Sequence, residues 1–163
     1  MMTRRIPVVV LALALLGAVP ATAQTDQQEL LKGLTAVQVA IGVSDDSTVC
    51  GVTETLLRTA TSKALLDNGV AVDDFTANTT LYITVLARYI DAWGQCVSRI
   101  GVELFSFVFA TPDHSEQQVY GRFMLADSSL MDTSGSAAHR QRIRDGVFKL
   151  VEALAVDIRL ANQ

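Results

Sequence analysis

The sequence predicts an α+β fold, a two-layer sandwich in which two helices cover one face of a mostly antiparallel sheet of four to five strands. Three segments rich in β-branched and aromatic residues follow one another with only short polar connections, at 81–90, 96–110 and 119–125. A segment with helical spacing precedes them and another follows. The predicted order is β-α-(β)-β-β-β-α, within a single domain over 34–163.

The first 23 residues have the features of an export signal. Arg4 and Arg5 precede an apolar run over 6–19, and the small residues Ala21 and Ala23 follow it. We expect a cleavable signal peptide over 1–23, a mature chain starting at Gln24, and a periplasmic or secreted location. The apolar run is shorter than the roughly 20 residues needed to cross a bilayer. The alternative is an uncleaved membrane anchor, and no later segment predicts a membrane span.

Composition favours an acidic exported domain over a nucleic-acid-binding one. The chain has 13 basic and 17 acidic residues, and cleavage would remove Arg4 and Arg5 as well. Nucleic-acid-binding domains favour basic patches, so no nucleic-acid partner is predicted. The two cysteines, Cys50 and Cys96, would meet an oxidising compartment, which favours a disulfide between them. The alternative is two separate small core residues.

The first elements follow from changes in hydrophobic period. Residues 24–33 are polar and short, and we expect a flexible N-terminal segment there. Alternating apolar residues over 34–44 predict a strand. Helical spacing over 49–68 predicts a helix, and Gly69 suits a left-handed C-cap. We expect the first strand and a short strand over 70–72 to pair at the edges of the sheet.

The second half of the chain predicts a meander and a closing helix. A turn containing Gly94 connects the two longest strands, 81–90 and 96–110. We expect the third strand to end at Leu125 and a polar loop to cover 127–136. Ser136 is a candidate cap for a final helix that runs to the end of the chain.

The long strands carry more apolar side chains than two helices can cover. In 81–90 and 96–110, apolar residues occupy both alternating sets of positions. Either the loops and the segment 24–33 cover the second face, or that face binds a partner. Aromatic side chains favour interfaces because they bring large areas at low entropic cost. The candidate interface residues are Tyr82, Phe105, Phe107 and Phe109.

No motif for catalysis, metal binding or phosphate binding stands out, and no cofactor is predicted. The acidic pairs at 45–46 and 73–74 fit turns, and His114 lies in a polar turn. His139 is expected on a charged surface in the first turn of the last helix. Arg140 and Arg144 share one face of that helix and are candidates for contact with anionic lipid or an acidic partner. The alternative is an ordinary solvated face.

The leading functional hypothesis is an exported, non-enzymatic module. It would contact a protein or an apolar ligand through the aromatic sheet face, with a second copy of the chain or another envelope protein as possible partners. One alternative is a small exported enzyme that uses the carboxylates of the loops. Another is an envelope-surface protein that binds anionic lipid through its C-terminal helix.

Overall fold

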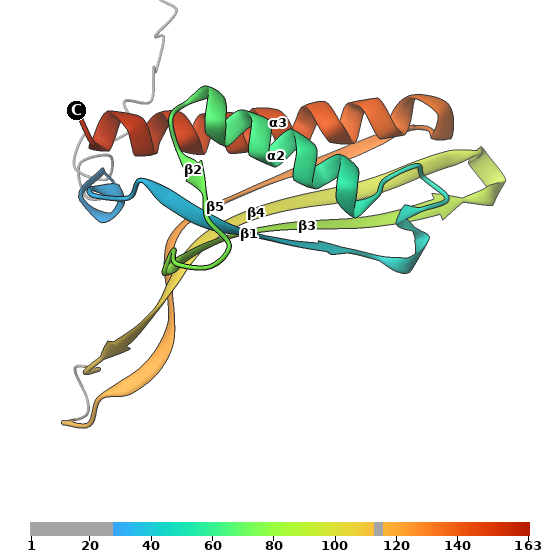
Figure 1. Ribbon diagram of the computed structural model, residues 1–163. Coiled ribbons are helices and arrows are strands. Elements are labelled where there is room, and N and C mark those ends of the chain that lie inside the picture. Colours follow the sequence, from blue (N-terminus) through green and yellow to red (C-terminus); the bar gives the residue numbers. More distant parts are fainter. Residues whose placement is uncertain (1–27, 113–115) are drawn as a thin grey trace, which may run out of the picture.

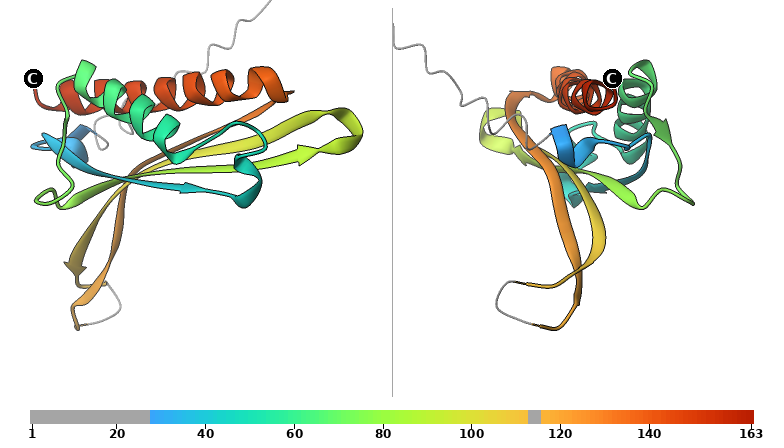
Figure 2. Two further views of the ribbon diagram at one scale, coloured as in Figure 1. Left: turned by 45° about the vertical axis from the view of Figure 1, so that its right-hand side comes forward. Right: turned by 90° about the vertical axis from the view of Figure 1, so that its left-hand side faces the viewer.

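A computed structural model describes residues 28–112 and 116–163 and confirms the α+β class (Figure 1). Helices α2 (Glu54–Asp67) and α3 (Ser136–Ala161) lie side by side on one face of a sheet with the order β2-β1-β3-β4-β5 (Figure 2). The strands are β1 Ala36–Val43, β2 Ala71–Val72, β3 Thr79–Ile90, β4 Gln95–Ala110 and β5 Val119–Gly135, with short 3-10 helices η1 Asp45–Ser47 and η2 Asp91–Trp93. The expected signal peptide over 1–23 lies outside the described residues.

The sheet is mixed. The strands β3, β4 and β5 form the predicted antiparallel meander, whereas β1 runs parallel to both of its neighbours, β2 and β3. The short strand β2 lies at the edge, as expected. The expectation of an edge position is wrong for β1, because it pairs with both β2 and β3 and lies between them. Its side chains Val37 and Val39 are buried in the core.

The helix α2 begins later than its hydrophobic period suggested. Thr53 is the N-cap, and its hydroxyl accepts a hydrogen bond from the backbone N–H of Leu56 at 3.3 Å. The expected left-handed end is present, because Gly69 follows the C-cap residue Asn68 with φ of 78°. The cap therefore fixes the start of this helix more sharply than its apolar residues do.

The prediction of a polar loop over 127–136 is wrong, because β5 continues to Gly135. This part of the strand pairs with β4 from Leu104 opposite Ala126 to Cys96 opposite Ser134. Backbone pairing with a strongly β-forming neighbour outweighs the low strand propensity of serine and aspartate. The predicted cap is also wrong, because Gly135 is the N-cap of α3 and no side chain caps it.

The core lies between the helices and one face of the sheet. We call the part of the molecule where the helices cover the sheet the body. Within it, burial alternates along β3 and β4, and every second side chain points toward the helices and is buried. Gly146 lets α3 approach closely, since a Cβ there would lie 2.9 Å from Cδ1 of Ile100 and 3.1 Å from Cδ2 of Leu130. The helix-facing strand residues are Leu81, Ile83, Val85, Ala87, Cys96, Ser98, Ile100, Val102 and Leu104.

The first described residues are tied to the end of α3. Leu31 is fully buried, and the Gly33 N–H donates to Oδ1 of Asn162 at 2.7 Å. The side-chain amide of Asn162 also donates to the carbonyl of Leu34 at 3.3 Å. Residues 28–33 of the expected flexible segment therefore lie against the C-terminal helix. Across the described part of the chain, neither the length nor the apolar character of any helix suffices for a membrane crossing.

Candidate functional site: the hairpin arm

The distal part of the β4–β5 hairpin leaves the body of the molecule and points away from the helices (Figures 1 and 2). We call residues 105–110 and 119–124 the arm. Its root is a β-bulge: Leu104 pairs with Ala126 but Phe105 pairs with Met124, so Leu125 is an extra residue on β5. A bulge bends and twists the strand that carries it, which explains the change of direction at this point.

One face of the arm carries a continuous row of aromatic rings. Phe105 meets Phe107 edge to face, with ring centroids 5.6 Å apart, and Phe107 stacks on Tyr120 at 5.6 Å. Tyr120 also contacts Phe109 at 4.9 Å. These four residues, which we call the aromatic row, come from both strands because directly paired residues share a face. Phe109 and Tyr120 are 69% and 63% exposed.

The opposite face of the arm is apolar as well. Val108, Val119 and Phe123 point to that side and remain substantially exposed. A sheet that faces water on one side would place polar residues there. The arm therefore exposes apolar side chains on both faces, which is unusual for a segment that stays in water.

The arm carries a single charge, which is paired within the chain. Arg122 is its one charged residue, and the guanidinium lies 4.0 Å from the centre of the Phe105 ring. Arg122 also forms an ion pair with Glu103, at the root of the arm. The cation is thus neutralised within the chain, and the aromatic row is left as the main feature that a partner would meet.

The four predicted interface residues fall in two places. Phe107 and Phe109 are exposed on the arm, and Phe105 is nearly buried at its root. Tyr82 lies apart on β3, where its phenol ring covers Gly42; a Cβ at Gly42 would lie 2.5 Å from the Tyr82 hydroxyl oxygen. Tyr120 is not among the residues that the sequence singled out. Its signal was present, because the segment 119–125 is also apolar at both alternating sets of positions.

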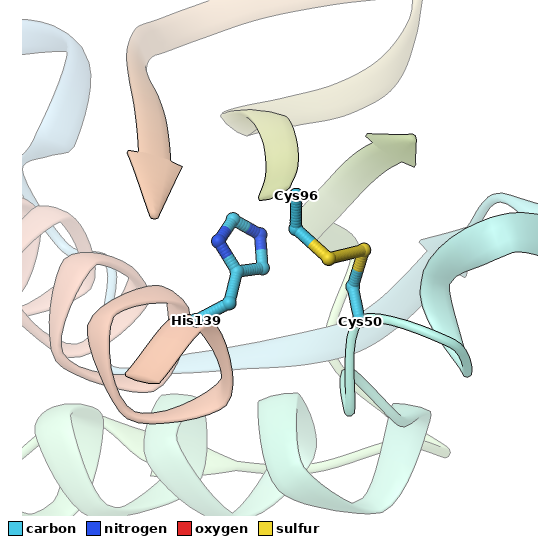
Figure 3. Close-up of side chains that lie close together, drawn as sticks. All are labelled: Cys50, Cys96 and His139. Atoms are coloured by element: carbon cyan, nitrogen blue, oxygen red, sulfur yellow. A yellow bond between two sulfur atoms is a disulfide. The ribbon is translucent and has the colours of Figure 1, made fainter. Parts of the chain in front are cut away.

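The disulfide between Cys50 and Cys96 is confirmed, with an S–S distance of 2.09 Å and a Cα–Cα distance of 5.8 Å. It joins the turn before α2 to the start of β4, and both cysteines are fully buried. Figure 3 shows the imidazole of His139 beside it. Disulfides persist in oxidising compartments, so the bond indicates such a location for the folded chain.

The expectation that His139 lies on a charged surface is wrong, because its side chain is fully buried. Its Nε2 lies 2.7 Å from Oγ of Ser98 and its Nδ1 lies 2.7 Å from Oγ of Ser134. Burial lowers the pKa of His139, and the nearby charge of Asp132 opposes this effect in part. The first turn of α3 packs onto the ends of β4 and β5, so this one side chain points inward while the adjacent arginines remain exposed.

The cluster around His139 contains the functional groups of a catalytic site, but a substrate could not reach them from solvent. Ser98, His139 and Asp132 follow the order hydroxyl, imidazole, carboxylate. However, Ser98 is only 1% exposed, which leaves no room for a substrate at its hydroxyl. The sulfurs of Cys50 and Cys96 lie near the imidazole, but they are bonded to each other and offer no thiolate to a metal. The cluster is a satisfied, buried polar network.

The acidic pair at 73–74 accepts hydrogen bonds from backbone N–H groups. The Asp73 carboxylate accepts hydrogen bonds from the Thr76 hydroxyl and from the backbone N–H groups of Phe75 and Thr76, and these bonds lower its pKa. Asp74 accepts from the N–H of Val39 at 3.2 Å. These contacts are those of a side chain that stabilises a turn. His114 lies outside the described residues.

No protein-family model and no curated protein matches the chain. Among solved structures, it resembles a minor lipoprotein from Acinetobacter baumannii, with 10% identity, 79% of this chain and 93% of that chain covered, and a TM-score of 0.42. It also resembles the PelC dodecamer from Paraburkholderia phytofirmans, with 14% identity, 78% of this chain and 88% of that chain covered, and a TM-score of 0.41. Similarity at this level carries no information on function.

Proposed function

We propose that this chain is an exported, non-enzymatic contact module whose arm binds a second copy of the chain. The export signal expected over 1–23 and the disulfide between Cys50 and Cys96 support the location. The observation that carries the proposal is the arm itself, which is apolar on both faces and extends beyond the shelter of the helices.

The isolation of the arm is the physical argument for a partner. Beyond Ser106, which pairs with Thr79, β4 has β5 as its neighbour and no other strand among the described residues. An isolated two-stranded hairpin is marginally stable in water. Exposed edges and exposed apolar faces both invite further pairing. A partner that covers the arm would satisfy its backbone groups and its aromatic side chains together.

A second copy suits this surface for reasons of charge and shape. The chain as a whole has a formal net charge of −4, so two bodies repel each other, whereas the one charge of the arm, on Arg122, is paired with Glu103 of the same chain. Two identical edges can pair about a two-fold axis. Such pairing would place the aromatic row of one copy beside that of the other on one continuous face, and each aromatic pair contributes about 0.5–1.5 kcal/mol beyond its buried area.

The test is the oligomeric state of an arm variant. The double variant Phe109→Ser, Tyr120→Ser removes two exposed rings without touching the core, and Phe75→Ser removes a 94% exposed ring from a distant loop as the matched control. Light scattering after size exclusion and sedimentation velocity are expected to show a dimer or larger assembly for the wild type and Phe75→Ser, and a monomer for the arm variant.

Two results would contradict the proposal. One is a wild-type protein that stays monomeric at its highest soluble concentration. The other is an assembly that persists unchanged in the arm variant, which would place the contact elsewhere. Binding of the monomeric wild type to vesicles, lost in the arm variant, would assign the arm to lipid instead.

A further inference from the structure

A groove of about 660 Å³ runs between α2 and α3 on the helical side of the molecule. The two helices run parallel, in the same direction. Gly51, just before α2, lies against Arg140 near the start of α3. Further along both helices, Nζ of Lys63 lies 5.9 Å from the centre of the Phe148 ring. The volume is within the range of small-molecule sites, about 300–1,000 Å³. The groove lies on the helical side of the molecule, apart from the arm.

The groove combines an apolar surface with polar margins. Leu56 and Ala60 of α2 and Phe148 of α3 supply the apolar part, and threonine hydroxyls of α2 lie alongside. Apolar walls with a few placed polar groups are typical of sites that bind an apolar ligand in a fixed orientation. This composition selects a ligand with a hydrocarbon part.

The charge of the groove is opposite to that of the chain. Three cationic side chains line it, Arg140, Arg144 and Lys63, against one carboxylate, that of Asp145. Arg144 pairs with Asp145 at 3.0 Å, and Lys63 pairs with Asp67 at 2.6 Å.

Arg140 differs from these two cations, because among the described residues its guanidinium has no hydrogen-bond or ion-pair partner. An arginine fork can bind a carboxylate or a phosphate through two parallel hydrogen bonds. The unpaired guanidinium beside an apolar wall therefore favours a ligand whose head carries negative charge.

We propose that the groove between α2 and α3 binds a single-chain anionic amphiphile as a dissolved molecule. Its alkyl chain lies against Leu56, Ala60 and Phe148, and its carboxylate or phosphate head meets Arg140, with Arg144 beside it. Charge selects the head and apolar area holds the chain, so neither part alone binds well. The two arginines that the sequence singled out thus contribute to a groove rather than to a flat basic surface.

Isothermal titration with dodecyl phosphate, kept below its micelle concentration, tests the site on the full mature chain. One saturable site is expected, with much weaker binding of dodecanol and none of dodecyltrimethylammonium. Arg140→Gln is expected to weaken binding by about tenfold or more. Thr59→Trp, which fills the groove from an exposed position of α2, is expected to abolish it. Arg99→Gln, an exposed arginine on the other face of the sheet, is the matched control and leaves the affinity unchanged.

Several results would overturn the inference. Equal affinity for the neutral or cationic probe would remove the role of Arg140, and unchanged binding in Thr59→Trp would remove the groove. Loss of binding in Phe109→Ser, Tyr120→Ser would place the amphiphile on the arm. Binding to anionic vesicles without binding of the dissolved probe would indicate a membrane surface. Circular dichroism and an intact disulfide show that each variant is folded, and Arg144→Gln provides a second reduction in charge.

Discussion

The two halves of β4 are similarly apolar, but the side chains of one half are buried and those of the other are mostly exposed. From Cys96 to Leu104, every second side chain is buried beneath the helices. From Phe105 to Ala110, the strand enters the arm, where Phe107 and Phe109 are mostly exposed. Cover from a second layer, and not strand composition, therefore decides whether apolar residues become core or contact surface.

The boundary between the halves is narrow. The Thr79 hydroxyl lies 2.7 Å from Oγ of Ser106, at the last pair that β3 makes with β4. The bulge at Leu125 bends β5 at almost the same level. Loss of a neighbouring strand and a change of direction therefore coincide, and the arm begins where both occur.

The largest effect is expected from the disulfide, which belongs to the body. The double variant Cys50→Ala, Cys96→Ala opens a loop whose ends are 46 residues apart. The entropy of closing this loop corresponds to a loss of about 4 kcal/mol in the free energy of unfolding. Urea denaturation of oxidised wild type and variant measures it. A loss under about 1 kcal/mol would show that the packing of the body is independent of this bond.

A matched pair of truncations tests the comparison within a single strand. Leu104→Ala empties a fully buried site and is expected to cost about 3 kcal/mol. Phe109→Ala, five residues further on, removes a larger but exposed side chain and is expected to change stability by less than about 0.5 kcal/mol in the monomer. Chemical denaturation at low protein concentration measures both. Equal losses would contradict the division between body and arm.

A pH effect is expected from the body through His139. Its pKa in the folded state lies below its ordinary value of 6.5, so the unfolded chain takes up the proton first as the pH falls. The stability contribution is therefore complete above about pH 6.5 and decreases below it, by at most about 1.4 kcal/mol per pH unit.

Denaturation of the wild type and His139→Gln from pH 7.5 to pH 5 isolates this contribution. The wild type should lose stability more steeply than the variant over the lower part of that range. A wild type that becomes more stable relative to the variant as the pH falls would show that the charge of Asp132, and not burial, controls the imidazole.

A small effect is expected at the root of the arm. Arg122→Gln removes the cation over Phe105 and the partly exposed ion pair with Glu103. Contacts of this kind contribute about 1 kcal/mol or less. Thermal denaturation should show a small shift, and added salt should reduce the difference between wild type and variant. A large loss would mean that the arm supports the body.

The sequence by itself determined the elements and their order. Runs of β-branched and aromatic residues marked two strands near their observed ends, at 81–90 for β3 and 96–110 for β4, because such runs are local features of the sequence. The disulfide followed from two cysteines and an expected oxidising compartment. The candidate site was identified only in part: Phe107 and Phe109 were named, but their position on a projecting arm was not.

Tertiary structure decided what depends on residues distant in the sequence. The polar end of β5 is a strand because β4 lies beside it, and His139 is buried because α3 packs onto the ends of β4 and β5. The pairing of Arg140 with an apolar groove likewise needed α2 next to α3. In each case a residue's structure is stabilised by contact with an element distant in the sequence. Local propensity contains no information on such contacts.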